Sequence, residues 1–161
     1  MEELVILFLF AITLHNLEEA LWLPAWSNYA SKYHKPVGKN EFHFAVICIT
    51  ALAYLSAFFY LYNPDSVLTK YFLSGFLGSM LLNAIFPHLL VTFLLKRYAP
   101  GLLTGVFLNI PINGLILYRF ISSNEVTLTE VMFSTLIVAG VLVGLIPVLF
   151  KIGKFMTSQY E

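Results

Sequence analysis

Five apolar segments constrain the fold of this chain more than any other feature. Each is about 18 residues or longer, and a helix of about 20 mostly apolar residues is long enough to cross the hydrocarbon core of a bilayer. The sequence therefore predicts an all-α, polytopic membrane helix bundle of about five transmembrane helices, with residues 1–161 in a single domain. The predicted spans are 3–23, 43–62, 69–95, 102–121 and 129–150.

The composition agrees with a membrane protein. Of the residues, 59% are hydrophobic and 11% are charged, whereas soluble domains are about 25% charged. A soluble protein this small could not hide so much apolar surface, so membrane lipid is the expected partner. The formal net charge of zero gives no reason to expect nucleic acid. The first segment is not expected to be a cleaved signal peptide, because Glu2 and Glu3 make its start acidic.

The connections between the segments predict the orientation in the membrane. Leu23-Pro24 is expected to end the first helix, and the longest loop is expected to run from Pro24 to about Phe42. With five spans, seven lysines and arginines fall at one set of helix ends and only two, Lys70 and Arg119, at the other. Basic residues concentrate on the cytoplasmic side. We therefore expect a multi-pass plasma-membrane protein with its N-terminus outside and its C-terminus in the cytoplasm.

Three ionisable residues lie inside the first apolar segment. His15, Glu18 and Glu19 share one helix face, because successive helical residues are about 100° apart. A charged group at the bilayer centre costs about 2.5–3.5 kcal/mol on insertion scales. Two carboxylates near a helix C-terminus also oppose the helix dipole. The cluster is therefore expected to be functional rather than a set of interfacial residues.

Polar residues of two other segments are predicted at the same depth. At 1.5 Å per residue, His15, His88 and Asn109 each lie roughly 12 Å below the cytoplasmic ends of their helices. Pro87 and Pro111 each free a backbone carbonyl nearby, which favours a shaped cavity. Further polar residues lie between this layer and the cytoplasm: Glu18, Glu19, Glu41, His43, Thr92 and Thr104.

These residue types favour a divalent metal, with Zn, Fe and Mn as candidates. His15 and Glu19 are an i,i+4 pair that can chelate one ion, and His88 would complete three ligands, with His43 as a possible fourth. Glu18 is then expected to be the catalytic general base. A two-metal site also fits this set of residues. So does metal-free proton transfer, because adjacent buried carboxylates repel each other.

The chain resembles a family of small prokaryotic membrane proteins named for the HXXEE motif. The resemblance rests on His15-Asn16-Leu17-Glu18-Glu19, on Asn83 and His88, and on a basic segment that continues through Pro-Gly to a threonine. It implies a polytopic membrane protein that binds metal, and it supports a site at the motif residues without supplying a substrate. The basic segment reads Lys96-Arg97-Tyr98-Ala99-Pro100-Gly101-Leu102-Leu103-Thr104.

The leading functional expectation is a metal-dependent membrane hydrolase acting on a lipid or a small lipid-like substrate from the cytoplasmic leaflet. Asn109 and Thr104 are expected to orient substrate or water, with Asn83 and Glu41 as further substrate contacts. Asn83 also fits the role of an interhelical hydrogen bonder. Two alternatives remain open: an ion, proton or metal transporter, which would be a homo-oligomer, and a metal-free acid–base isomerase of a lipid.

Overall fold

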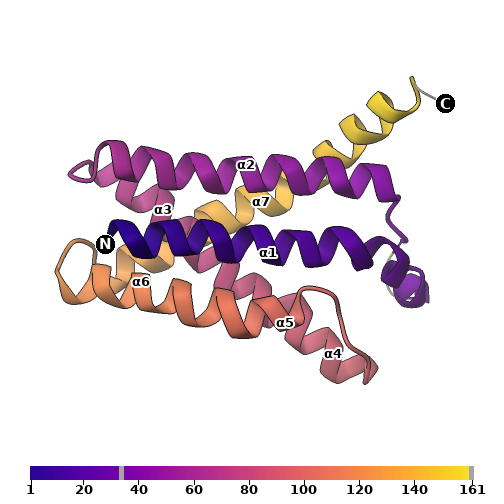
Figure 1. Ribbon diagram of the computed structural model, residues 1–161, viewed down its shortest axis with the longest axis horizontal. Coiled ribbons are helices and arrows are strands. Elements are labelled where there is room, and N and C mark those ends of the chain that lie inside the picture. Colours follow the sequence, from indigo (N-terminus) through magenta and orange to yellow (C-terminus); the bar gives the residue numbers. More distant parts are fainter. Residues whose placement is uncertain (33–34, 160–161) are drawn as a thin grey trace.

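The computed structural model describes residues 1–32 and 35–159, and these form a bundle of long helices (Figure 1). Within these residues, five helical segments are long and apolar enough to cross a membrane, which confirms the predicted all-α membrane bundle. Three spans are single helices: α1 (Glu2–Ser27), α2 (Lys39–Tyr62) and α7 (Leu128–Thr157). The third span joins α3 (Val67–Asn83), η2 (Ala84–Leu89) and α4 (Leu90–Leu95). The fourth joins α5 (Leu102–Thr104), η3 (Gly105–Asn109) and α6 (Ile110–Ser122), and η1 (Tyr29–Lys32) is a short turn.

The spans alternate in direction, so the bundle has two distinct ends. The N-terminus and the turns at 63–66 and 123–127 lie at one end (Figure 1). The connection 96–101, η1 and the start of α2 lie at the other, and α7 extends beyond the bundle there (Figure 1). We call this second end the 96–101 end. It holds the side chains that the sequence predicts as a site.

A plug of large apolar side chains fills the bundle on the N-terminal side of that site. Phe8, Phe76 and Phe120 are fully buried together with Leu77 and Ile116. The rings of Phe8 and Phe76 meet edge to face, with their centroids 6.4 Å apart, a favoured geometry for aromatic pairs. Many apolar side chains on the outside of the bundle are exposed, as expected for helices that face lipid.

Small and hydroxyl-bearing residues let the helices approach closely. At Gly78 of α3, an added Cβ would lie 1.9 Å from Oγ1 of Thr135 in α7, so only glycine permits this approach. Asn16 of α1 donates a 2.7 Å hydrogen bond to Oγ1 of Thr50 in α2. Such small residues and interhelical hydrogen bonds are the usual contacts between membrane helices.

The prediction that Leu23-Pro24 ends the first helix was wrong, because α1 continues through Pro24 to Ser27. Proline has no N–H to donate to the carbonyl four residues earlier, so the carbonyl of Ala20 loses its usual partner. His43 of α2 supplies a new one, since its Nε2 donates to that carbonyl at 2.8 Å. A side chain from the neighbouring helix therefore lets the helix pass the proline.

The third and fourth spans each contain a widened, π-type turn at the depth of the predicted site. These turns are η2, which holds Pro87 and His88, and η3, which ends at Asn109 just before Pro111. Inside η2 the backbone of Phe86 leaves the helical region, with φ −129° and ψ 116°. The third span is therefore kinked at Phe86 rather than continuously helical, whereas a π-type turn such as η3 is a feature frequently found at functional sites.

Candidate metal centre

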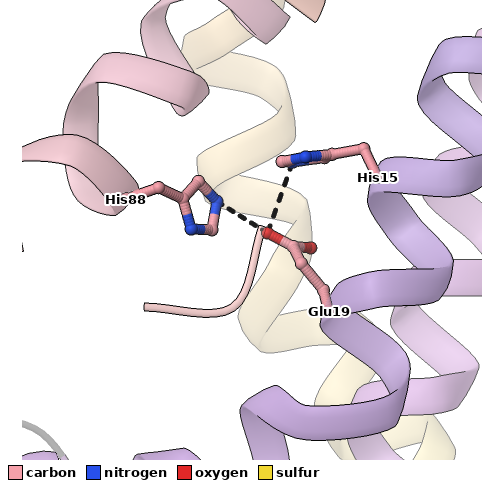
Figure 2. Close-up of side chains that lie close together, drawn as sticks. All are labelled: His15, Glu19 and His88. Atoms are coloured by element: carbon pink, nitrogen blue, oxygen red, sulfur yellow. Dashed lines mark ion pairs between the residues drawn. The ribbon is translucent and has the colours of Figure 1, made fainter. Parts of the chain in front are cut away.

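Two histidines and one carboxylate converge near the 96–101 end of the bundle (Figure 2). Oε1 of Glu19 lies 2.7 Å from Nε2 of His88 and 3.5 Å from Nε2 of His15. One ligand atom from each of the three residues lies within 4.8 Å of the others. The His15 side chain is fully buried, and those of His88 and Glu19 are 2% and 14% exposed. The structure thus brings together three of the four predicted metal ligands.

Local helix geometry positions these side chains. His15 and Glu19 are four residues apart on α1, so they lie one above the other on one face. The wide turn η2 carries His88 toward them from the third span, and the two imidazole rings meet nearly at right angles, at 88° with centroids 5.2 Å apart. The i,i+4 pair follows from the sequence alone, whereas the direction of His88 depends on the irregular turn.

The hydrogen bonds around Thr104 determine which nitrogen of His15 carries a proton. Oγ1 of Thr104 donates to Oε2 of Glu18 at 2.6 Å. The hydroxyl has only one proton, so at its 3.0 Å contact with Nδ1 of His15 it must accept. Nδ1 therefore carries a proton, and in the neutral ring Nε2 presents a lone pair toward Glu19 and Asn83. We call this chain from Glu18 through Thr104 to His15 the Glu18 relay.

A lone pair that faces a carboxylate at 3.5 Å is repelled by it, and a cation between the two would remove that repulsion. The Glu18 relay leaves Nε2 of His15 without a proton to offer Glu19, so a cation in this space would satisfy both groups. Two imidazoles and one carboxylate are a common ligand set for catalytic zinc, with bonds of about 2.0–2.2 Å. Tetrahedral ligands at this bond length are roughly 3.3 Å apart, so His88 and Glu19 would have to separate by about half an ångström. The donor set and its geometry therefore fit a divalent metal.

Glu18, the predicted general base, accepts four hydrogen bonds. Oε1 accepts from the hydroxyl of Tyr98 and, at 2.7 Å, from the backbone N–H of Gly101. Oε2 accepts from the N–H and the hydroxyl of Thr104, at 3.0 and 2.6 Å. The first N–H groups of a helix lack partners within that helix, so Glu18 caps the fourth span at its start. Its negative charge also lies at the positive end of that helix dipole. This arrangement favours a positioning role for Glu18.

Gly101, which the sequence analysis did not single out, allows the loop to reach both histidines. Its φ of +94° lies in the left-handed region that favours glycine. An added Cβ would lie 2.6 Å from Cε1 of His88 and 3.0 Å from Cε1 of His15. The Pro100-Gly101 pair predicts a turn from the sequence. Nothing in the sequence indicates that this turn lies against the two histidines.

Tyr98, also absent from the predicted site, lies in the connection between the third and fourth spans. Its hydroxyl donates to Glu18 and accepts from the N–H of Leu103 at 3.2 Å. Burial, and secondly the hydrogen bond to Glu18, raise the pKa of Tyr98 to about 12. The tyrosine therefore stays protonated at neutral pH and holds the 96–101 connection against α1.

Asn83, a predicted substrate contact, lies within the cluster instead. Its side-chain Nδ2 is 3.1 Å from Nε2 of His15 and 3.2 Å from Nε2 of His88. As a donor, it meets the lone pair on Nε2 of His15, whereas Nε2 of His88 faces Glu19 at 2.7 Å. After a half-turn of the amide it would present Oδ1, which is a metal ligand, to the same point. In either orientation, Asn83 adds a polar group from α3 to the centre.

The other predicted site residues have different surroundings. His43, the possible fourth ligand, uses Nε2 as a donor to Ala20 and does not join the cluster. Glu41 accepts a 3.3 Å hydrogen bond from the N–H of Gly38 and so caps the start of α2. Asn109 is fully buried, as is Asn113 one turn further along. Neither side-chain amide has a hydrogen-bonding partner among the described residues.

The fold and the centre define a class of protein: a five-span helical membrane protein with histidine and glutamate side chains converging inside the bundle. Residues 6–116 match the family model described as "Protein of unknown function with HXXEE motif". The chain belongs to this family. It is also 59% identical over 149 residues to the uncharacterized protein YrkK of Bacillus subtilis, an alignment that covers 92% of this chain and 94% of that protein. No solved structure matches the chain.

Proposed function

We propose that this chain is a membrane-embedded, metal-dependent hydrolase that acts on a lipid or amphipathic substrate from the cytoplasmic leaflet. The observation that carries the proposal is the convergence of His15, Glu19 and His88, whose ligand atoms lie within 4.8 Å of one another, with Nδ1 of His15 held by Thr104 in the Glu18 relay. Three protein ligands leave a position open for substrate or water. A metal there would supply Lewis-acid activation of a carbonyl or phosphoryl oxygen.

Each protein group then has a specific role. His15, His88 and Glu19 hold the ion, and Asn83 holds the ligand geometry or adds a fourth ligand. Glu18 fixes the tautomer of His15 through Thr104 and keeps the 96–101 connection closed over the centre. Hydrogen-bonded carboxylates behind metal-binding histidines are a common arrangement, because they orient the ring and raise its basicity.

The deciding experiment is elemental analysis of protein purified in mild detergent without added metal. We expect about one Zn, Fe or Mn ion per chain in the wild type, and strong loss in His15→Ala and His88→Ala. His43→Ala is the matched control, because His43 lies on the adjacent helix but is bonded to Ala20. The metal proposal fails if the wild type holds no metal, or if the control loses as much metal as the other two variants.

Transport remains the second candidate, because Asn109 and Asn113 continue the polar interior along the fourth span. The buried apolar plug around Phe8, Phe76 and Phe120 disfavours it, because these rings fill the interior on the N-terminal side of the site. Metal or proton flux in liposomes that Glu18→Gln abolishes would favour a transporter. Activity on a lipid that persists in excess chelator would favour the metal-free isomerase.

A further inference from the structure

A groove runs through the bundle beside the candidate metal centre. It has a volume of about 300 Å³ and lies between α1, α2, α7 and the third span. Most of its walls are apolar, formed by residues such as Met80, Leu142 and Ile146. One part of the wall is polar, because it is formed by Glu19 and Asn83, which also belong to the candidate metal centre. The groove therefore joins an apolar interior to the point where a metal would be held.

The rim of the groove faces the surrounding lipid. Leu82 and Phe86 of the third span are 46% and 65% exposed, and Val143 of α7 is 69% exposed. All three lie inside spanning segments, where the outer surface of the bundle meets hydrocarbon rather than water. Near the start of α2, the rings of Phe42 and Phe150 meet at 6.3 Å and form part of the wall. The open side thus favours entry from the bilayer.

We propose that this groove binds one hydrocarbon chain of an amphiphile whose carbonyl-bearing head reaches Glu19 and the two histidines. The placement of the head rests on the proposed function. A volume of about 300 Å³ is at the small end of the range for ligand pockets, so the groove suits part of a single fatty-acyl chain. Apolar walls with a few polar groups at one point are typical of sites for amphipathic ligands.

The test uses photo-crosslinking with palmitic acid that carries a diazirine in its chain. Wild-type protein in nanodiscs is labelled, digested and analysed by mass spectrometry. We expect crosslinks to groove residues such as Met80 and Val143. They should weaken when the metal is removed by chelator or by His15→Ala, because the carboxylate head then loses its anchor.

Two valines of α7 provide a matched pair of variants. Val143 lies on the groove and Val141 does not, yet they are similarly exposed at 69% and 61%. Val143→Trp should block the mouth and reduce groove labelling by about tenfold, equivalent to about 1.4 kcal/mol. Val141→Trp should leave labelling unchanged. Ala139→Leu should fill the groove from within and have the same effect as Val143→Trp. Retained metal content in all three variants would show that they fold.

The outcomes separate this inference from the proposed function. Equal labelling in Val143→Trp and Val141→Trp, or labels spread over the lipid-facing surface, would overturn the groove as a binding site even if the metal is present. Groove labelling that is unchanged by chelator and by His15→Ala would support the groove but overturn the placement of the head at the metal. Groove labelling that is reduced in Val143→Trp, unchanged in Val141→Trp and weakened by chelator and by His15→Ala supports the whole proposal.

Discussion

Replacing Thr104 by valine removes the hydroxyl that joins Glu18 to His15 but keeps the branched shape of the side chain. Nδ1 of His15 then loses its acceptor, at present 3.0 Å away, and the ring is no longer fixed in the tautomer that exposes Nε2. The backbone N–H of Thr104 still donates to Glu18 at 3.0 Å, so the 96–101 connection should stay docked. The expected loss is therefore one of metal affinity rather than of fold.

The magnitude follows from comparable sites. Removing a partner behind a metal-binding histidine weakens metal affinity by about 10–100-fold, or about 1.4–2.7 kcal/mol. Thr104→Ser is the matched control, because it keeps the hydroxyl and should remain close to wild type. The assay is a competition titration of Zn²⁺ between the detergent-solubilised protein and a chromophoric chelator, with thermal unfolding of the metal-free forms measured in parallel.

Two results would refute this reasoning. The first is wild-type affinity in Thr104→Val, which would mean that the Glu18 relay does not set the basicity or orientation of His15. The second is equal weakening in Thr104→Ser and Thr104→Val, which would show that shape rather than the hydroxyl matters. If metal-free Thr104→Val unfolds at a much lower temperature than the metal-free wild type, the threonine acts through the fold and the relay assignment falls.

Three further predictions concern single residues. Gly101→Ala should abolish metal binding and lower stability by more than about 1 kcal/mol, because φ is positive and the new Cβ meets His88 at 2.6 Å; normal metal content would contradict this. Asn113→Leu should raise stability by about 1–3 kcal/mol in thermal unfolding, since it removes a buried amide that has no partner among the described residues; a loss of stability would show that the amide is satisfied. For Tyr98 the folded pKa of about 12 exceeds the unfolded value of about 10, so its stabilising contribution is complete below about pH 10 and is lost as pH rises through about 12. The stability gap between wild type and Tyr98→Phe should therefore shrink from about pH 8 to about pH 11, and a constant gap would count against the Glu18 contact.

The spans and part of the centre could be predicted because they depend on local sequence. Apolar length alone predicts all five spans, and the i,i+4 spacing alone predicts that His15 and Glu19 share a helix face. Counting residues from the helix ends also predicted that His88 lies level with His15, and the centroids of the two rings are 5.2 Å apart. These inferences need only the regular rise and turn of a helix.

The remainder depends on contacts between segments, which the sequence does not encode in any local pattern. Pro24 predicts a helix end, but the sequence gives no sign that His43 would supply a hydrogen bond to the freed carbonyl. The same contact holds Nε2 of His43 at Ala20, outside the cluster of His15, Glu19 and His88. Likewise, the sequence alone predicts that Glu18 is available as a general base. In the structure, the backbone N–H groups of Gly101 and Thr104 donate hydrogen bonds to its two oxygens.

The spacing of the motif acquires a physical reason from these contacts. Adjacent residues on a helix point about 100° apart, so Glu18 and Glu19 cannot serve the same partner. Glu19, four residues from His15, lies on the Nε2 side of the ring, while Glu18 reaches the Nδ1 side through Thr104. The positive end of the fourth span offsets the charge of Glu18, whereas Glu19 faces the two histidines and is the carboxylate available to the proposed metal. Glu18 and Glu19 could exchange these two roles only in a different helix register. The centre therefore uses both glutamates of the motif, one on each side of the His15 ring.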